Sequence, residues 1–294
     1  MTDEKNRVDG GTLYLVATPI GNLADLSPRA LKILGEVDFI AAEDTRNTGQ
    51  MLSLFGISRP MVPYHEHNRM SAGEEIRQRL TRGESCALVT DAGTPAVSDP
   101  GEDLVRLCVE HGIPVTSVPG CCAAITALTL SGLPTDRFTF EGFLPSASAA
   151  RIRALGDLKP ERRTMIFHEA PHRLLGTLSD MRDAFGGDRR LAVCREMTKL
   201  NEEILRTTID QALRHFETVA PRGEFVLVVA GNTQRDAETL NAMSIEDHFN
   251  FYIKTGLDRK EAVKAVARDR KVPKNDIYMA VMGIREDPAR QEED

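Results

Sequence analysis

Apolar and polar positions alternate in two regular patterns along the first 130 residues. Short runs that are apolar throughout predict strands buried on both faces, at residues 12–17, 38–42, 61–65, 85–90 and 114–118. Segments of helical period lie between them, starting at Pro28 after the N-cap residue Ser27 and continuing at 45–55, 72–82, 100–111 and 121–130. This alternation predicts an α/β fold in which helices cover both faces of a parallel, doubly wound sheet.

A second region of strands and helices follows Gly132-Leu133-Pro134. Strand-like runs occupy residues 138–143, 164–168, 191–195, 204–208 and 224–230, and helical patterns occupy 149–158, 171–185 and 210–217. Only one short helix separates the last two runs, which favours a mixed sheet over a purely parallel one.

The chain turns polar after Gly231-Asn232 and then shows three short helical patterns, near residues 244–255, 258–270 and 273–282. The acidic stretch 286–294 is expected to be a frayed tail. We therefore predict an N-terminal α/β domain over 12–131, a second α/β domain over 132–232 and a small C-terminal helical extension over 240–284.

Composition excludes several classes of protein. Hydrophobic residues make up 41% of the 294 positions and charged residues 28%, which is ordinary for a globular protein and argues against disorder or a coiled coil. No apolar run approaches the ~18 residues of a membrane span, and the polar start of the chain does not resemble a secretory signal. The five cysteines lack Cys-x-x-Cys spacing, so we expect neither a zinc site nor a disulfide framework, and we expect a reducing cytoplasm.

The net charge of −7 argues against a protein that binds nucleic acid over most of its surface. The charge is unevenly distributed, because residues 254–274 hold eight Lys or Arg against three acids, whereas the tail from Arg285 holds two against five. The basic segment is either a solvated helix face or a local contact for phosphates.

Three turn-rich loops follow predicted strands, at residues 18–23, 91–101 and 118–123. Neither a Walker loop nor Gly-x-Gly-x-x-Gly is present, so the two commonest kinds of nucleotide site are not expected. Open α/β sheets bind ligands at the carboxyl ends of their strands, and glycines there let a backbone approach a ligand. Three such loops on one edge predict a ligand site, although ordinary strand-to-helix turns use the same residues.

Charged clusters follow the second and third predicted strands on the same edge, at residues 43–48 and 65–68. The first is either a solvated loop or acid/base machinery. His65 and His67 lack a third ligand, so we expect no metal and favour a polar loop that contacts substrate. For Cys121 and Cys122 we favour small-residue packing over a nucleophile, because no His–Asp pair is identifiable as their base.

In the second region, residues 167–173 and 194–199 place charged side chains at strand ends. These clusters either face the first domain across a polar cleft or form structural ion pairs at the junction.

Together these motifs resemble one family. Residues 14–25 (Tyr-Leu-Val-Ala-Thr-Pro-Ile-Gly-Asn-Leu-Ala-Asp) resemble the opening signature of the tetrapyrrole methylase superfamily. Further motifs are similar to the branch that methylates the 2′-hydroxyl of a decoding-centre cytidine in 16S rRNA; they are residues 43–46, 64–68, 91–95, 132–138, 141–145 and 195–199. The resemblance implies a two-domain fold of that superfamily with S-adenosylmethionine between the domains, a homodimer, and 16S rRNA or the 30S subunit as partner.

The same resemblance implies which residues contact the methyl donor. They are Pro19, Gly21, Gly93, Thr94, Pro95, Val97, Cys122, Ala123, Phe167, His168, Arg195, Phe225 and Val226. Thr94 stands where the superfamily usually has aspartate, and Cys121-Cys122 replace its usual Pro-Ser.

Methyl transfer to a ribose oxygen needs alignment of the two reactants and a destination for the hydroxyl proton. The candidate proton acceptors are Glu43, Asp44 and Glu196, and Arg46 and Lys199 are candidates for an electrostatic role or for holding a phosphate. Candidate RNA contacts are His65, His67, Asn68, Arg151, Arg153, Lys264 and Arg268. Residues 146–153 contain fewer basic residues than the same segment often has in relatives, so we expect fewer contacts to RNA phosphates there.

Two other functions remain open at this point. One is a small-molecule methylase of the same superfamily, against which the C-terminal extension and the loop 64–68 argue. The other is a non-enzymatic ribosome assembly factor, which the altered Cys121-Cys122 loop favours.

Overall fold

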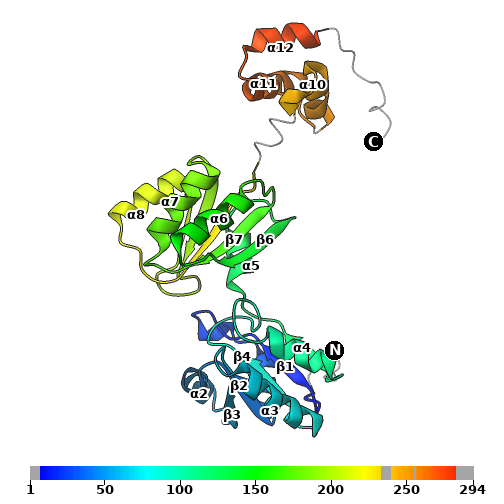
Figure 1. Cartoon of the computed structure of the whole chain (residues 1–294), viewed down its shortest axis with the longest axis vertical. Coiled ribbons are helices and arrows are strands. Elements are labelled where there is room, and N and C mark those ends of the chain that lie inside the picture. The colour runs from blue at the N-terminus through cyan, green and yellow to red at the C-terminus, as the bar shows by residue number, and fades with distance from the viewer. Residues whose placement is uncertain (1–6, 233–239, 255, 283–294) are drawn as a thin grey trace. The chain divides into compact units, whose positions relative to one another are not determined.

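The computed structural model describes residues 7–232, 240–254 and 256–282, so the predicted acidic tail lies outside the described residues. The chain divides into two compact units. One contains two five-stranded sheets, and the other contains the C-terminal helices together with residues 160–162 (Figure 1).

The first sheet has the strand order β3-β2-β4-β1-β5, and all its pairs are parallel. Its strands are β1 (Leu13–Val16), β2 (Phe39–Ala42), β3 (Met61–Pro63), β4 (Cys86–Val89) and β5 (Val115–Val118). Its helices are α1 (Pro28–Glu36), α2 (Thr45–Leu54), α3 (Arg69–Thr81) and α4 (Glu102–Glu110), whereas α5 (Ala123–Leu130) follows β5 in the chain but packs against the second sheet. The predicted doubly wound parallel sheet is thereby confirmed.

The uniform apolar pattern of these strands follows from two cores, one on each face. In β2, Ile40 and Ala42 belong to one hydrophobic cluster, whereas Phe39 and Ala41 belong to the other. Each successive side chain therefore meets a different layer of helices, and no position of the strand is left to water.

The second sheet has the order β6-β7-β10-β8-β9, with β6 parallel to β7 and all other pairs antiparallel. The strands are β6 (Phe138–Phe143), β7 (Thr164–Glu169), β8 (Arg190–Arg195), β9 (Glu203–Thr208) and β10 (Phe225–Val229). Its helices are α6 (Ser148–Leu158), α7 (Leu174–Phe185) and α8 (Ile209–Thr218). The predicted mixed sheet is confirmed, although β9 and β10 do not pair because β8 lies between them.

The C-terminal unit consists of α10 (Ile245–Lys254), α11 (Arg259–Arg270) and α12 (Lys274–Val281), close to the three predicted helices. Asp258 caps α11 by accepting a hydrogen bond from the backbone N–H of Glu261 at 2.8 Å. The unit has its own apolar core, which includes Phe249, Val266 and Ile277.

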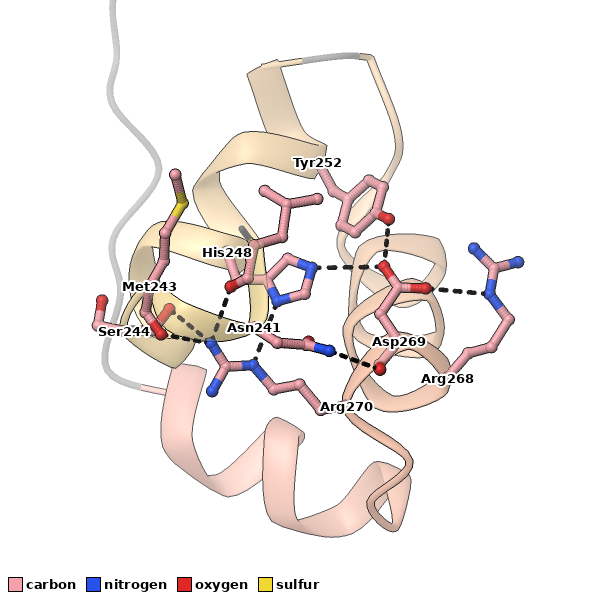
Figure 2. Close-up of polar contacts among 9 residues, drawn as sticks. Asn241, Met243, Ser244, His248, Tyr252, Arg268, Asp269 and Arg270 are labelled. Atoms are coloured by element: carbon pink, nitrogen blue, oxygen red, sulfur yellow. Dashed lines mark hydrogen bonds and ion pairs between the residues drawn. The ribbon is translucent and has the colours of Figure 1, made fainter. Parts of the chain in front are cut away.

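A buried polar network joins α10 to α11 (Figure 2). His248 is fully buried, and its Nδ1 accepts a hydrogen bond from Nε of Arg270 at 3.2 Å. Its Nε2 lies 3.4 Å from a carboxylate oxygen of Asp269, to which the Tyr252 hydroxyl also donates. Because the polar groups of buried His248 and its half-buried neighbours meet one another, the network fixes how the two helices pack.

Within the described part of the chain, none of the helices has both the length and the apolar character needed to cross a membrane.

Candidate functional site

The loops after β1, β4 and β5 are hydrogen-bonded to one another. The backbone N–H of Thr18 donates to the carbonyl of Gly93 at 2.9 Å, and the N–H of Gly93 returns a bond to Thr18 at 3.1 Å. The Thr94 hydroxyl donates to the carbonyl of Cys121 at 2.8 Å. The three loops therefore form one rim at the carboxyl edge of the sheet, where open α/β sheets bind ligands.

Glycine is required where this rim is tightest. A Cβ on Gly120 would lie 2.8 Å from the Cβ of Ala17, so any larger residue would push the β5 loop away from β1. Gly93 has φ of +86°, a conformation that side-chain-bearing residues rarely adopt.

The β1 loop also meets the second sheet. A Cβ on Gly21, where φ is +143°, would lie 2.4 Å from Cγ of Lys199 and 3.0 Å from the Thr198 hydroxyl. Folding thus brings together Gly21 and Lys199, two predicted site residues that are far apart in the sequence.

Backbone strain concentrates in two of the site loops. Five non-glycine residues of the described chain have positive φ, and four of them are Ala96, Ser98, Glu196 and Thr198. The fifth, Lys271, ends a helix. Strained residues cluster where a fold holds a functional geometry, which favours these loops as the working part of the molecule.

Carboxyl groups gather after β2 and β4. Glu43 accepts a long hydrogen bond from the N–H of Asp91 at 3.4 Å, and Asn47 donates to the Asp91 side chain at 2.9 Å. Burial, together with the charges of Glu43 and Asp91, raises the pKa of Asp99 to about 6. The sequence pattern did not single out Asp99 as a site residue. The available signal was that Asp99 is a further acid, besides Glu43 and Asp91, in the loops at the carboxyl edge of the first sheet.

Asp44 is engaged with its own helix. Its carboxylate caps α2 through the N–H of Arg46 at 2.8 Å and also accepts from the Arg46 guanidinium at 2.7 Å. These hydrogen bonds lower the pKa of Asp44 to about 2, so this carboxylate is a weak base.

Glu196 and Lys199 are partners of each other. Glu196 accepts from the N–H of Glu224 and from Lys199, both at 2.9 Å, and Lys199 also reaches Glu224 at 2.8 Å. The bonds from the Glu224 backbone and from Lys199 lower the pKa of Glu196. Burial lowers the pKa of Lys199, but its hydrogen bonds to Glu224 and Glu196 outweigh that effect and raise it overall.

The predicted residues of β7 and β10 divide between the two faces of the second sheet. Phe167 and Phe225 are buried in the core beneath α6, α7 and α8, so only their backbone is available to a ligand. Val226 packs on the opposite face with α5, opposite His168 in the strand register.

His168, predicted to contact the methyl donor, has a buried polar atom without a hydrogen-bond partner in the described part of the chain. Its ring lies against Phe140 and Phe143, with centroids 5.2 and 5.4 Å away, and burial lowers its pKa. Its Nε2 is buried with no hydrogen-bond partner among the described residues. A neutral imidazole with an unused nitrogen is suited to a polar ligand.

The remaining residues predicted to contact the methyl donor lie at the ends of helices and strands or in the loops next to them. Pro19 and Pro95 are buried, Val97 is exposed, and Cys122 precedes the first turn of α5, which Ala123 begins. Arg195 donates to the carbonyl of Arg222 at 2.7 Å and pairs with Glu203 at 3.2 Å.

The predicted RNA contacts are spread over three places. His67 is exposed, and Asn68 closes the turn after β3 by accepting from the N–H of His65 at 2.8 Å and donating to Pro63 at 2.9 Å. No group of three potential metal ligands occurs among the described residues. Lys264 and Arg268 belong to α11 of the C-terminal unit.

The structure differs from expectation at Arg151. This side chain is buried, and its Nε donates to Asp180 at 2.7 Å, so the guanidinium forms an internal ion pair rather than a surface contact for phosphate. Arg153, two residues later on α6, is exposed.

Known proteins resemble this chain over nearly its whole length. The profile of the tetrapyrrole (corrin/porphyrin) methylases matches residues 12–213. The chain is 46% identical to ribosomal RNA small subunit methyltransferase I of Synechocystis sp., over 94% of this chain and 99% of that protein. Identity to the protein of the same name from Halalkalibacterium halodurans is 48%, over 93% and 96% of the two chains.

A solved structure shares the fold. Uroporphyrin-III C-methyltransferase from Thermus thermophilus, complexed with S-adenyl homocysteine, superposes with a TM-score of 0.51 at 16% identity. The superposition covers 76% of this chain and 99% of that one.

Proposed function

The chain belongs to the tetrapyrrole (corrin/porphyrin) methylase family and, within it, to the ribosomal RNA small subunit methyltransferases I, and from this premise we propose which group it methylates. It is a methyltransferase that uses S-adenosylmethionine. The acceptor we propose is the ribose 2′-hydroxyl of a decoding-centre cytidine in 16S rRNA, presented on the 30S subunit. The similarity to rRNA methyltransferases over 93–94% of the chain carries this proposal.

The residues of the loop rim fit a sulfonium nucleoside. Gly21 and Gly120 let the rim loops pack closely against Lys199 and Ala17, and Gly93 presents its backbone without a side chain, so backbone groups of the rim can approach the methyl donor. The unused Nε2 of His168 offers a hydrogen-bonding atom to a polar group of the donor. S-adenosylmethionine, when bound, supplies a methyl group that is already activated, so holding the acceptor in line is the main task left to the protein.

The hydroxyl proton needs an acceptor, and we assign this role to the pair Glu43 and Asp99. Asp44 and Glu196 are the weaker candidates, because bonds from Arg46, from Lys199 and from a backbone N–H stabilise their charged forms. Asp99 is half-buried beside Glu43 and Asp91, and its raised pKa of about 6 matches a base that works near neutral pH. Arg46 is exposed at the same edge and is placed to hold a backbone phosphate of the RNA.

The experiment is methyl transfer from radiolabelled S-adenosylmethionine to 30S subunits that lack the modification, with free 16S rRNA in parallel. We expect label on the 30S subunit, in a ribose that yields a nuclease-resistant dinucleotide at the cytidine. Label on a base, or on a porphyrinoid and not on rRNA, would overturn the proposal. Calorimetry that detected no binding of S-adenosylmethionine would favour a non-enzymatic assembly factor.

We further propose that the enzyme works in the cytoplasm as a homodimer, as the family resemblance implies. Light scattering of the purified chain should give twice the mass of one chain.

A further inference from the structure

Residues of α11 and α12 in the C-terminal unit, two helices labelled in Figure 1, line a groove. It encloses about 320 Å³, with Val263 and Val281 among its lining residues. Lys260 and Lys264 line it from α11, and Lys274 and Tyr278 line it from α12. The groove therefore joins an apolar floor to a basic rim.

Arg259 and Arg270, among the described residues of this unit, make internal contacts. Arg270 points inward, donating to His248 and to the carbonyls of Leu240, Met243 and Ser244 (Figure 2). Arg268 pairs with Asp269 at 3.3 Å. Arg259, although it lines the groove, donates to the carbonyl of Val281 at 3.3 Å and stacks over Phe249. Arg259 and Arg270 therefore serve the packing of the helices, whereas Arg268 is exposed and pairs with its neighbour on the same helix.

The lysines of the groove are differently placed. Lys260, Lys264 and Lys274 are all exposed, and no ion pair within the described residues joins any of them to a carboxylate. The nearby acids Glu261 and Asp276 do not line the groove. Three unpaired ammonium groups around one groove repel one another, and an anion with several charges would relieve that repulsion.

An aromatic ring lies beside these lysines. The Tyr278 side chain is 55% exposed, and Met282, one turn later in the sequence, is 62% exposed. Exposed aromatic rings next to lysines characterise surfaces that bind single-stranded nucleic acid, because bases stack on the ring while phosphates meet the cations.

We propose that this groove binds a single-stranded segment of RNA, with phosphates at Lys260, Lys264 and Lys274 and one base stacked on Tyr278. The proposal rests on the proposed function, since an enzyme that modifies rRNA needs a second hold on a substrate much larger than its catalytic loops. Duplex RNA would contact only the lysines, because its bases are already stacked on one another. An acidic protein segment would pair with the lysines but has no base to stack on the Tyr278 ring.

The first test measures binding of a fluorescent single-stranded RNA of about ten nucleotides to the full chain at several salt concentrations, by anisotropy. Lys264→Gln should reduce the slope of log affinity against log salt by about 0.7, the value for one phosphate contact on a single strand. The matched control is Lys254→Gln, which removes the same charge at the end of α10, outside the groove, and should leave the slope unchanged. Equal slopes for the two variants would overturn the proposal.

The second test separates stacking from charge. Tyr278→Ala should weaken binding of the single strand roughly tenfold, whereas Tyr278→Phe, which keeps the ring, should bind like the parent chain. Met279→Ala is the control, because Met279 is 69% exposed on the same helix but does not line the groove. Equally tight binding of a duplex of the same length, or no effect of Tyr278→Ala, would overturn the proposal.

Failure of the groove and failure of the proposed function give different results. If the parent chain methylates 30S subunits but the groove variants bind RNA normally, only the groove is wrong. If the parent chain does not methylate rRNA but Lys264→Gln and Tyr278→Ala still weaken RNA binding, the proposed RNA-binding groove is supported and the proposed methylation reaction is rejected.

Discussion

At the scale of single residues, neighbouring groups give chemically similar carboxyl side chains different pKa values. Asp44 and Glu196 are held in the charged form by hydrogen bonds, whereas Asp99 is pushed toward the neutral form by burial and by the charges of Glu43 and Asp91. The sequence could place Glu43, Asp44 and Glu196 near the site, because each follows a predicted strand. It could not rank them, because their pKa values depend on groups brought together only by folding.

The proposed role of Asp99 as proton acceptor predicts a pH dependence of the reaction. With a folded-state pKa of about 6, this carboxyl group gains its basic form as the pH rises through 6, so the rate of methyl transfer to 30S subunits should rise over the same interval. Asp99→Asn should lower the rate ~10²-fold or more and remove this inflection. The measurement is the pH profile of kcat/KM for both proteins.

A stability measurement separates a chemical role from a structural one. A raised carboxyl pKa stabilises the folded state fully below the unfolded value of 3.8, and this stabilisation is lost as the pH rises through about 6. Asp99→Asn resembles the protonated form, so urea unfolding at pH 7 should show a variant at least as stable as the parent chain. A slow variant that is also unfolded would argue for a structural role instead.

At the scale of elements, the site depends on loops that approach one another closely. The β1 loop reaches the loop after β8 at Gly21, and the β5 loop reaches the end of β1 at Gly120. The sequence indicated these loops through their glycines and their common sheet edge. The contact between Gly21 and Lys199 was not predictable, because nearly 180 residues and a second sheet separate them.

Gly21→Ala should disrupt this contact. The added methyl group would lie 2.4 Å from Cγ of Lys199 in a conformation that alanine rarely adopts, so we expect a loss of about 1–3 kcal/mol in stability and weaker binding of S-adenosylmethionine. Calorimetry and urea unfolding measure the two effects.

Gly35→Ala provides the matched control. Gly35 lies in α1 with no atom within 4 Å of an added Cβ, so alanine should stabilise the helix by about 0.5–1 kcal/mol and leave donor binding unchanged. Normal donor binding by Gly21→Ala would show that the close approach does not shape the site.

At the scale of the whole molecule, the chain joins two units with separate cores. The α/β unit holds the loop rim, and the C-terminal unit holds the basic groove and a core of its own. The net charge of −7 is thus compatible with an RNA partner whose contacts are local.

Separate cores predict separate unfolding. Phe249 is 1% exposed, and Phe249→Ala should cost the C-terminal unit about 3–5 kcal/mol, enough to unfold so small a unit. Hydrogen exchange should then increase throughout α10, α11 and α12 while β1 and β4 stay protected. Phe251→Ala, at a position 40% exposed on the same helix, should leave exchange unchanged. Loss of protection in β1 and β4 as well would mean that the two units unfold together.

The sequence by itself determined the alternation of strands and helices, the mixed second sheet, the three C-terminal helices and the family, because periodicity, capping residues and loop motifs are local properties of the chain. Only the tertiary structure decided that the pKa of Asp99 is raised while those of Asp44 and Glu196 are lowered. It also decided that Arg151 and Arg270 make internal contacts, and that Lys260, Lys264 and Lys274 share a groove with Tyr278. Those outcomes depend on burial and on contacts between residues far apart in the chain, which no local pattern records.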